Sequence, residues 1–404
     1  MSNIRGLSAV AVLLVLAACA GRAGESVPAI AYTPDTARVR VIAPGVIHRY
    51  LWDRNGPWAI HVIEARLGGE CSLELRTAKA NDRIVGRETT SNLAREFARK
   101  TGRPMVAMIN ADFFLFDPPG VPTGTQVIAG ELVSAGPRWP VVGTARVKGR
   151  LQPFISSDSL LGQLSAGPDR LILIRLVNRR PDSARVAAYN PYYGPMTPSD
   201  NGVVEVAVDY SPSAERIGEV SRGVVTTVDS SRPGIPIGGR NRIVFAARNE
   251  KARIALEKMR PGDSVTFSFS YPGAPGPVVE MVGGFPLLVS PGQADLPKRW
   301  ADRPASFIGR NPRTAIGWRA DGTVLLVTVD GRRPGYSMGM TLDEMVDLSR
   351  KLGAREMLNL DGGGSTAMVI DHRLVNKPTD KEGERAVANA IGIAASRNCP
   401  IKRI

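Results

Sequence analysis

Short apolar runs separated by turn residues follow one another along the chain, and this pattern constrains its fold more than any other feature. The runs are rich in Val, Ile and aromatic residues and end at Gly, Pro or Asp, as β-strands do. With 42 Gly and 31 Pro among 404 residues, the composition favours a fold rich in turns. We predict an α+β fold, a strand-rich single domain with a mixed or antiparallel sheet and a few packed helices. The predicted strands are Trp58–Ala65, Cys71–Arg76, Met105–Ile109, Leu171–Leu176, Gly202–Asp209, Arg242–Ala247 and Ser264–Tyr271.

Two segments have the pattern of amphipathic helices. Thr90–Lys100 carries two large apolar residues four positions apart, which places both on one helix face. Leu342–Leu352 has a similar apolar stripe and is preceded by Thr341. Thr341 and Glu344 form the S/T-x-x-E capping box of a helix start, and Gly353 is a typical helix end.

The N-terminus has the features of an export signal. Arg5 precedes the apolar run Leu7–Ala18, which is too short to span a bilayer but suits the core of a signal peptide. The run ends in Leu-Ala-Ala-Cys19, which resembles a bacterial lipobox, so we expect a mature protein that starts at a lipidated Cys19. The alternative is an ordinary secretory signal with an incidental cysteine. The expected segments are a signal peptide (1–18), a tether (19–38), a single folded domain (39–396) and a C-terminal tail (397–404).

This signal predicts a location in the cell envelope, exported and lipid-anchored. Ala20 follows the cysteine, which resembles the outer-membrane sorting rule and predicts the outer membrane or periplasmic side in a Gram-negative host. The expected contact with the membrane is through the lipid anchor only. In this oxidising setting Cys71 and Cys399 either form a disulfide or remain two separate buried thiols.

The net charge of +14 fits an acidic partner. Because the basic residues are scattered, and pairs such as Arg179-Arg180 and Arg332-Arg333 are short, the pattern lacks the concentrated basic stripe of a nucleic-acid binder. We therefore predict that nucleic acid is not a partner.

The histidines argue against two common hydrolase chemistries. The chain has three, His48, His61 and His372, and no two are at metal-ligand spacing. Zinc and Ser-His-Asp chemistry are therefore unsupported. Acid–base work falls to carboxylates, as in glycoside hydrolysis. No metal site and no cofactor are predicted, although clustered Asp residues leave open a divalent cation that bridges a phosphate.

The run Glu356–Leu360 leads into Asp361 and three glycines, Gly362, Gly363 and Gly364, and then Ser365 and Thr366. A phosphate-binding P-loop needs a helix directly after its glycines and a Lys before its Ser/Thr, and this chain has neither. Successive glycines instead let a ligand approach the backbone closely. Asn359 and Asp361 flank an apolar residue at period 2, so we expect both side chains to face the same way.

Several polar motifs at predicted strand ends come in the order found in phosphodiester glycosidases. The chain resembles this family, that of the N-acetylglucosamine-1-phosphodiester α-N-acetylglucosaminidases, over about residues 45–396, most specifically over 311–393 and least over 145–275. Relatives often have Gly where Ala111 stands. The motifs are Asn110-Ala-Asp112-Phe-Phe114, Pro122–Glu131, Gly283–Val289, Asn311–Gly317, Val329-Asp-Gly-Arg332, Asn359–Thr366, Leu374-Val-Asn376 and Gly383-Glu-Arg385 through Asn389.

The resemblance implies hydrolysis of the sugar–O bond of a sugar-1-phosphodiester, so the expected partner is a phosphate-containing glycan. The leaving group is a phosphomonoester whose second pKa is about 6, so a guanidinium can stabilise its departing charge; Arg313 and Arg332 are the expected clamp. Asp361 is the expected nucleophile or water-activating base, and Asp112 or Glu131 the second carboxylate. The expected substrate-binding residues are Asn110, Arg313, Thr314, Asp330, Arg332, Asn359, Gly362, Gly363, Gly364, Ser365, Thr366, Glu384 and Asn389.

Two other functions remain open from the sequence. One is a non-catalytic envelope lipoprotein that binds phosphorylated glycans in the same cleft. The other is a phosphodiesterase that breaks the O–P bond instead of the sugar–O bond. The sugar, the acceptor and the stereochemical course are open as well.

Overall fold

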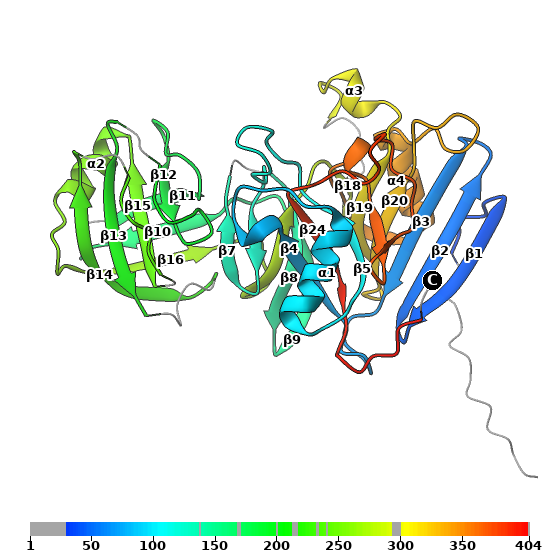
Figure 1. The fold of residues 1–404 in the computed structure, drawn as a ribbon, viewed down its shortest axis with the longest axis horizontal. Helices are drawn as coiled ribbons and strands as arrows, with labels where there is room; N and C mark the ends of the chain where they lie inside the picture. Colours follow the sequence, from blue (N-terminus) through cyan, green and yellow to red (C-terminus); the bar gives the residue numbers. More distant parts are fainter. Residues whose placement is uncertain are drawn as a thin grey trace, which may run out of the picture.

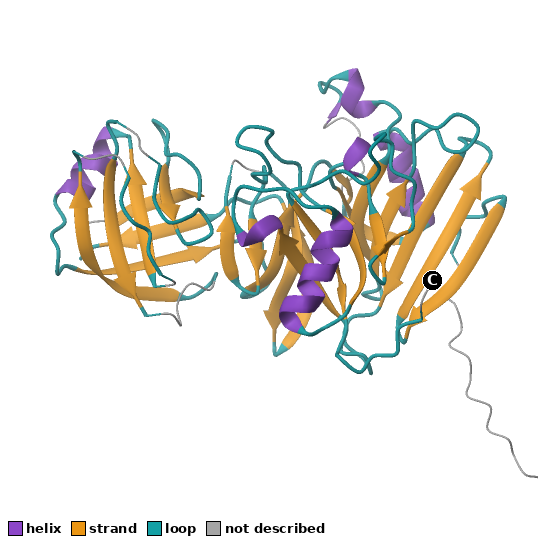
Figure 2. Cartoon of the chain, in the orientation of Figure 1, coloured by secondary structure: helices purple, strands orange, loops and turns teal. Residues whose placement is uncertain are grey.

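The structure is a computed structural model, and strands make up most of its regular structure (Figures 1 and 2). The predicted signal peptide and Cys19 lie outside the described residues. Within the part that is described, no helix is both long and apolar enough to cross a membrane. The described residues are 30–136, 139–167, 171–198, 201–211, 217–231, 234–239, 241–292 and 300–402.

An antiparallel sheet forms one end of the molecule, where Figure 1 shows its first strands in blue. The predicted strand Trp58–Ala65 is confirmed at the predicted bounds, and it pairs with both β2 and β20. Residues 36–65 of the chain therefore lie beside residues 313–359. The seven strands in spatial order are β1 (Thr36–Ala43), β2 (Val46–Asp53), β3 (Trp58–Ala65), β20 (Val324–Val329), β19 (Arg313–Arg319), β21 (Ala354–Asn359) and β18 (Leu287–Val289).

A second sheet packs against the first, and its central strand β5 contributes Val106, Ala107 and Ile109 to the shared apolar core. A third sheet lies in the middle of the molecule, between the first sheet at one end and strands β10–β16 at the other (Figure 1). The second sheet has the order β23 (Arg373–Leu374), β22 (Met368–Ile370), β5 (Met105–Asn110), β24 (Asn389–Ala394) and β4 (Glu74–Lys79). The third has the order β7 (Glu131–Ser134), β6 (Gln126–Ile128), β17 (Val278–Gly283), β8 (Val141–Val147) and β9 (Arg150–Ser156).

A closed barrel is inserted between β9 and β17. It contains the one parallel pair among the described strands, β11 with β12. Its apolar core is continuous with that of the third sheet, because Val127, Leu132 and Met281 belong to the same buried cluster as the barrel residues. The order around the barrel is β10 (Leu161–Ser165), β11 (Leu171–Val177), β12 (Val186–Tyr189), β15 (Arg242–Ala247), β13 (Val204–Tyr210), β14 (Val220–Asp229) and β16 (Ser264–Ser270).

Helices are few, and both predicted helices are confirmed within two residues. The Thr341 hydroxyl accepts the Glu344 N–H while the Glu344 carboxylate accepts the Thr341 N–H, so the predicted capping box is present. The α+β fold class is confirmed. The helices are α1 (Thr90–Thr101), α2 (Glu250–Glu257), α3 (Ala305–Ile308) and α4 (Leu342–Lys351), with short 3₁₀ turns η1 (Ala80–Asp82) and η4 (Gly363–Ser365).

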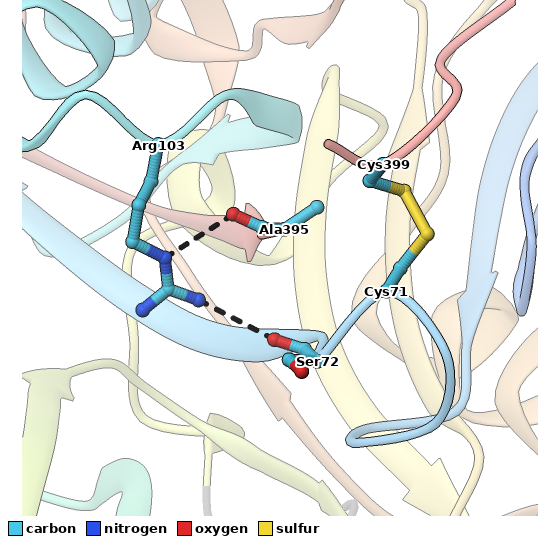
Figure 3. The surroundings of a disulfide bond; sticks show 5 residues. All are labelled: Cys71, Ser72, Arg103, Ala395 and Cys399. Atoms are coloured by element: carbon cyan, nitrogen blue, oxygen red, sulfur yellow. Dashed lines mark hydrogen bonds between the residues drawn. A yellow bond between two sulfur atoms is a disulfide. The ribbon is translucent and has the colours of Figure 1, made fainter. Parts of the chain in front are cut away.

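A disulfide joins Cys71, just before β4, to Cys399 near the C-terminus, 328 residues away (Figure 3). Arg103 supports both sides of this link: its Nε donates to the Ala395 carbonyl and its Nη2 donates to the Ser72 carbonyl. The C-terminal segment is thereby held against the body that carries the site described next.

Candidate active site

Asn110, at the end of β5, fixes three separate chain segments to one another. Its Nδ2 donates to the main-chain oxygen of Asp361 at 2.6 Å. Its Oδ1 accepts the Thr314 hydroxyl at 2.8 Å and the Ala367 N–H at 3.1 Å. Because the side chain is fully buried and its oxygen accepts from two protein donors, Asn110 positions the Asp361 loop and does not face solvent, where a sugar hydroxyl would approach.

Asp112 is the buried carboxylate of the site, with 1 % of its surface exposed. Its two oxygens accept the Thr123 hydroxyl at 3.0 Å and the Gly124 N–H at 2.7 Å. Burial raises the pKa of Asp112 to about 7, opposed by these two donors and by the charge of Arg179 and reinforced by the charge of Asp361. Asp112 is therefore able to hold a proton near neutral pH.

Two glycines make room for this carboxylate. A Cβ on Gly283 would lie 2.6 Å from the Asp112 Oδ2, and one on Gly124 would lie 2.8 Å from it. Asn389, at the start of β24, holds the other side: its Oδ1 accepts the Asp112 N–H at 2.9 Å, and its Nδ2 donates to the Gln126 Oε1. Asn389 is fully buried and thus positions Asp112.

Asp361 differs from Asp112 because its side chain is partly open to solvent. Its main-chain N–H donates to the Ala111 carbonyl at 2.9 Å, which places it beside the Asp112 segment. Burial among the surrounding protein atoms raises the pKa of Asp361 to about 6, opposed by the nearby Ser365 hydroxyl, the Gly362 N–H and the positive charge of Arg385. Asp361 is therefore ionised at neutral pH and accessible.

The glycine loop after Asp361 brings two guanidinium groups close to the backbone. A Cβ on Gly363 would lie 3.1 Å from the Arg332 Nη2. A Cβ on Gly364 would lie 2.1 Å from the Arg385 Nη2, so only glycine leaves space for Arg385 there. Arg385 is held by Asp380 in a two-pronged ion pair with N–O distances of 2.6 and 2.9 Å.

Of the two arginines predicted as the phosphate clamp, only Arg332 is exposed. Its Nη2 donates to the Asn311 amide oxygen at 2.9 Å. Arg313 is buried, and its Nε and Nη2 donate to the carbonyls of Met340, at 2.8 Å, and Phe307, at 2.9 Å. Arg313 therefore ties α3 to the segment before α4, and its Nε and Nη2 are not available to a phosphate.

Other predicted binding residues also serve the scaffold. Asp330 is buried and accepts hydrogen bonds from the Asn376 amide, the Lys377 N–H and the Tyr336 hydroxyl. Thr314 and Thr366 are buried beside Asn110. The Glu384 carboxylate accepts the Ser91 N–H at 2.9 Å and the Ser91 hydroxyl. It therefore neutralises the N-terminus of α1.

Asn359 and Asp361 do not share an environment, although they were expected to face the same way. The Asn359 amide is buried and donates to the Phe285 carbonyl at 2.7 Å and to the Leu360 carbonyl at 2.8 Å. Its Oδ1 has no hydrogen-bond partner among the described residues. Asn359 holds the Phe285 segment and retains one unused acceptor.

Glu131 lies apart from this cluster. In the hairpin of β6 and β7, Gln126 pairs with Ser134 near the Asp112 loop, whereas Glu131 pairs with Ile128 at the other end. Three residues of strand span about 10 Å. The Glu131 carboxylate is exposed and accepts the Tyr192 hydroxyl of the barrel at 2.9 Å. A second catalytic carboxylate at Asp112 fits this arrangement better than one at Glu131.

Four partly exposed aromatic rings form a wall next to Asp112. Phe113 lies 5.7 Å from Trp139 and 6.1 Å from Phe307, and Phe285 lies 5.3 Å from Trp139 and 6.0 Å from Phe307, all between ring centroids. Arg303 lies over the Phe285 ring at 4.8 Å. Rings of this kind offer apolar faces to a sugar.

The barrel contributes one residue to the site. Arg179, in the connection from β11 to β12, donates from Nη2 to the Pro122 carbonyl, and its charge acts on Asp112. Neither Arg179 nor the aromatic wall was among the predicted site residues. Arg179 belongs to an isolated basic pair in a region with weak motifs, so the sequence carries no signal for its position. Arg385 was visible only as part of the 383–389 motif.

Across the described chain, no three His, Cys, Asp or Glu side chains gather in a way that could hold a metal ion. The Asp112 and Asp361 carboxylates instead receive hydrogen bonds or charges from protein donors. The divalent cation left open by the sequence remains untested.

Part of the chain that carries this site is similar to a known protein family. The family model for phosphodiester glycosidases matches residues 214–394. This match confirms the resemblance read from the motifs. It covers the Asn359–Thr366 loop and Asn389, whereas the Asn110–Asp112 motif lies outside it.

Two individual proteins match parts of this chain. An uncharacterised prophage-derived protein of Bacillus subtilis is 38 % identical over 95 residues, 24 % of this chain and 14 % of that protein. The mouse N-acetylglucosamine-1-phosphodiester α-N-acetylglucosaminidase is 35 % identical over 68 residues, 17 % of this chain and 13 % of that protein. The matches therefore span about one seventh of each relative.

The fold is shared with a solved structure. A hypothetical protein from Synechocystis has a TM-score of 0.70 at 19 % identity, covering 89 % of this chain and 64 % of that chain. At this identity the likeness concerns the fold alone.

Proposed function

We propose that the chain is a hydrolase that cleaves the sugar–O bond of a sugar-1-phosphodiester in an envelope or extracellular glycan. The observation that carries this proposal is the pair of carboxylates. Asp361 is accessible and has a pKa of about 6, whereas its neighbour Asp112 is enclosed and has a pKa of about 7. Two carboxyl groups whose environments separate their pKa values are the basis of acid and base assignments in glycosidases.

In the proposed reaction, ionised Asp361 attacks the anomeric carbon or takes a proton from the attacking water. The bond between that carbon and the phosphate oxygen breaks, and the oxygen keeps the electron pair. The departing phosphomonoester is a better leaving group than an alkoxide. A proton donated by Asp112 therefore assists its departure, but departure does not depend on that proton alone.

Three guanidinium groups are in position to stabilise the phosphate. Arg332 and Arg385 flank the glycine loop, and Arg179 stands beside Asp112. Fixed charges of this kind lower the energy of the transition state where negative charge develops. The aromatic wall supplies faces on which the sugar ring can stack.

The test is release of free reducing sugar from a panel of sugar-1-phosphodiesters, beginning with α-N-acetylglucosamine esters. We expect release by the wild type, a loss of at least about 1,000-fold in Asp361→Asn, and full activity in Asp347→Asn. Asp347 is an exposed carboxylate on α4 and serves as the matched control. Wild-type rates in a well-folded Asp361→Asn protein would refute the central assignment.

The two alternatives differ in measurable products. Hydrolysis in ¹⁸O-labelled water places the label on the sugar if the sugar–O bond breaks and on the phosphate if the O–P bond breaks. A phosphoglycan-binding protein would bind the esters and release no sugar.

The exported, lipid-anchored location is part of the same proposal. It rests on the Leu-Ala-Ala-Cys19 motif in the sequence. Metabolic labelling with a fatty acid tests it: label in the wild type and none in Cys19→Ser is expected, and equal labelling would overturn it.

A further inference from the structure

A cavity of about 650 Å³ lies where the barrel meets the rest of the molecule. Its walls come from the end of β11 and the residues after it on one side, and from the segments at 84–85 and 115–121 on the other. None of the functions argued so far uses this cavity, yet it borders the segment that carries Asp112.

The cavity is cationic on one side and apolar on the other. The basic residues are Arg179, Arg180 and Arg185, of which Arg185 pairs with Asp182. The apolar side is lined by Ile84, Val85, Leu115, Pro118 and Val121. A sixth apolar lining residue, Leu176, lies on the β11 side, and the one acidic lining residue is Asp117.

The apolar side reaches the surface as a patch of large exposed side chains. Val85 is 39 % exposed, Leu115 is 38 % exposed and Phe116 is 72 % exposed. An exposed cluster of this kind beside a cavity marks a binding surface more often than a single exposed side chain does.

One hairpin links the segment that lines the cavity to the candidate active site. The Leu115 N–H donates to the Val121 carbonyl at 2.9 Å, and nearer the site the Gly124 N–H donates to the Asp112 carboxylate. Leu115 comes three positions after Asp112, which is at most about 10 Å along the chain. Arg179 bridges the two regions, since it lines the cavity, bonds the Pro122 carbonyl and acts on Asp112.

We propose that this cavity binds the non-sugar part of the substrate, and that this part is amphiphilic: a phosphate ester of an alkyl chain. The inference rests on the proposed function. Arg179 binds the phosphate, and the apolar side chains of Ile84, Leu115 and Val121 contact the alkyl chain. A polyhydroxylated acceptor would instead bury hydroxyl groups against these side chains without hydrogen-bond partners, which is costly.

The test compares methyl, butyl and octyl esters of one sugar-1-phosphate, each below its micelle concentration. A fully buried methylene contributes about 0.8 kcal/mol, or about fourfold in affinity. We expect kcat/KM to rise at least about 100-fold from methyl to octyl. Leu115→Ser should flatten this dependence, because it lowers kcat/KM for the octyl ester far more than for the methyl ester. Leu171→Ser, at a position 59 % exposed on β11, is the matched control and should keep the wild-type slope.

A second measurement separates this inference from the proposed function. Octyl phosphate is titrated calorimetrically into the wild type and into Leu115→Ser. Tight binding to the wild type and at least tenfold weaker binding to the variant supports the cavity assignment even if no ester releases sugar. Equal kcat/KM for methyl and octyl esters, or a slope that survives Leu115→Ser, overturns the amphiphilic acceptor while leaving the glycosidase assignment intact.

Discussion

The two carboxylates predict the shape of the pH dependence. If Asp361 reacts as a carboxylate and Asp112 as an acid, the active enzyme carries one proton on the pair, on Asp112. With pKa values of about 6 and about 7, this form reaches about 60 % of the enzyme near pH 6.5 and about 3 % at pH 4.5 and at pH 8.5. We therefore expect kcat/KM to fall about 20-fold, two pH units to either side of its maximum.

The assay is kcat/KM for sugar release between pH 4.5 and 8.5, for the wild type and for Asp112→Asn. An asparagine keeps the hydrogen bonds of Asp112, because its oxygen accepts the Gly124 N–H and its amide can donate to the Thr123 hydroxyl. A phosphodiester keeps one charge throughout this range, so the substrate does not contribute to the profile.

Asp112→Asn should lower the maximum rate and remove the alkaline fall, while the acid fall assigned to Asp361 remains. A variant that retains the alkaline fall would show that Asp112 only positions the loop. A wild-type profile that is flat from pH 5 to 8 would refute the assignment of both groups. Because the two sites interact, the fitted values belong to the pair.

Three further outcomes follow. Gly364→Ala displaces Arg385, since the added Cβ would lie 2.1 Å from its Nη2. Because the Arg385 charge lowers the pKa of Asp361, its displacement should lower kcat/KM and shift the acid side of the pH profile to higher pH. The midpoint of urea unfolding should be nearly unchanged. Replacing Cys71 and Cys399 by Ser removes a disulfide between residues 328 positions apart. The free energy of unfolding should fall by up to about 6 kcal/mol, from the chain entropy that the unfolded state regains. A decrease of less than about 1 kcal/mol in urea unfolding would contradict this prediction. Burial lowers the pKa of His61, so acid favours the unfolded chain, in which this histidine can take up a proton. The free energy of unfolding should therefore fall below about pH 6.5, by at most about 1.4 kcal/mol per pH unit for this group. A His61→Gln variant whose free energy of unfolding falls with the same slope in acid would argue against it.

Local patterns were sufficient to predict many elements of the fold. Trp58–Ala65 and Arg242–Ala247 have the predicted bounds because their runs are bounded by turn residues. The strand predicted at Cys71–Arg76 begins three residues later, at Glu74, because Ser72 adopts a positive φ in the preceding turn. The barrel was not predicted, since its closure depends on pairing β10 with β16 about 100 residues away and nothing in either strand specifies that partner.

The candidate site was predictable as a set of segments but not as a set of roles. The motifs at 110–112, 359–366 and 389 do converge, and the family likeness made that expectation possible. Whether an arginine in such a motif binds substrate or backbone depends on which carbonyls the fold brings to it. The Arg313 guanidinium donates to four such carbonyls, whereas Arg332 donates to the Asn311 side chain. Arg179 reaches Asp112 only because the inserted barrel places it there.

Some residues of the site position the backbone and others are accessible to a substrate, and mutations at the two kinds of position should differ in effect. Asn110, Asn389 and Asp330 each satisfy several backbone or side-chain groups that would otherwise be buried without partners. Removing one partner of such a network costs about 1–3 kcal/mol for each group left unpaired. Substitutions there should lower activity together with stability, whereas Asp361→Asn and Arg332→Ala, at accessible positions, should lower activity with little change in unfolding. Loss of activity alone therefore does not identify a catalytic residue in these motifs. Loss of activity identifies one only where the midpoint of urea unfolding is unchanged.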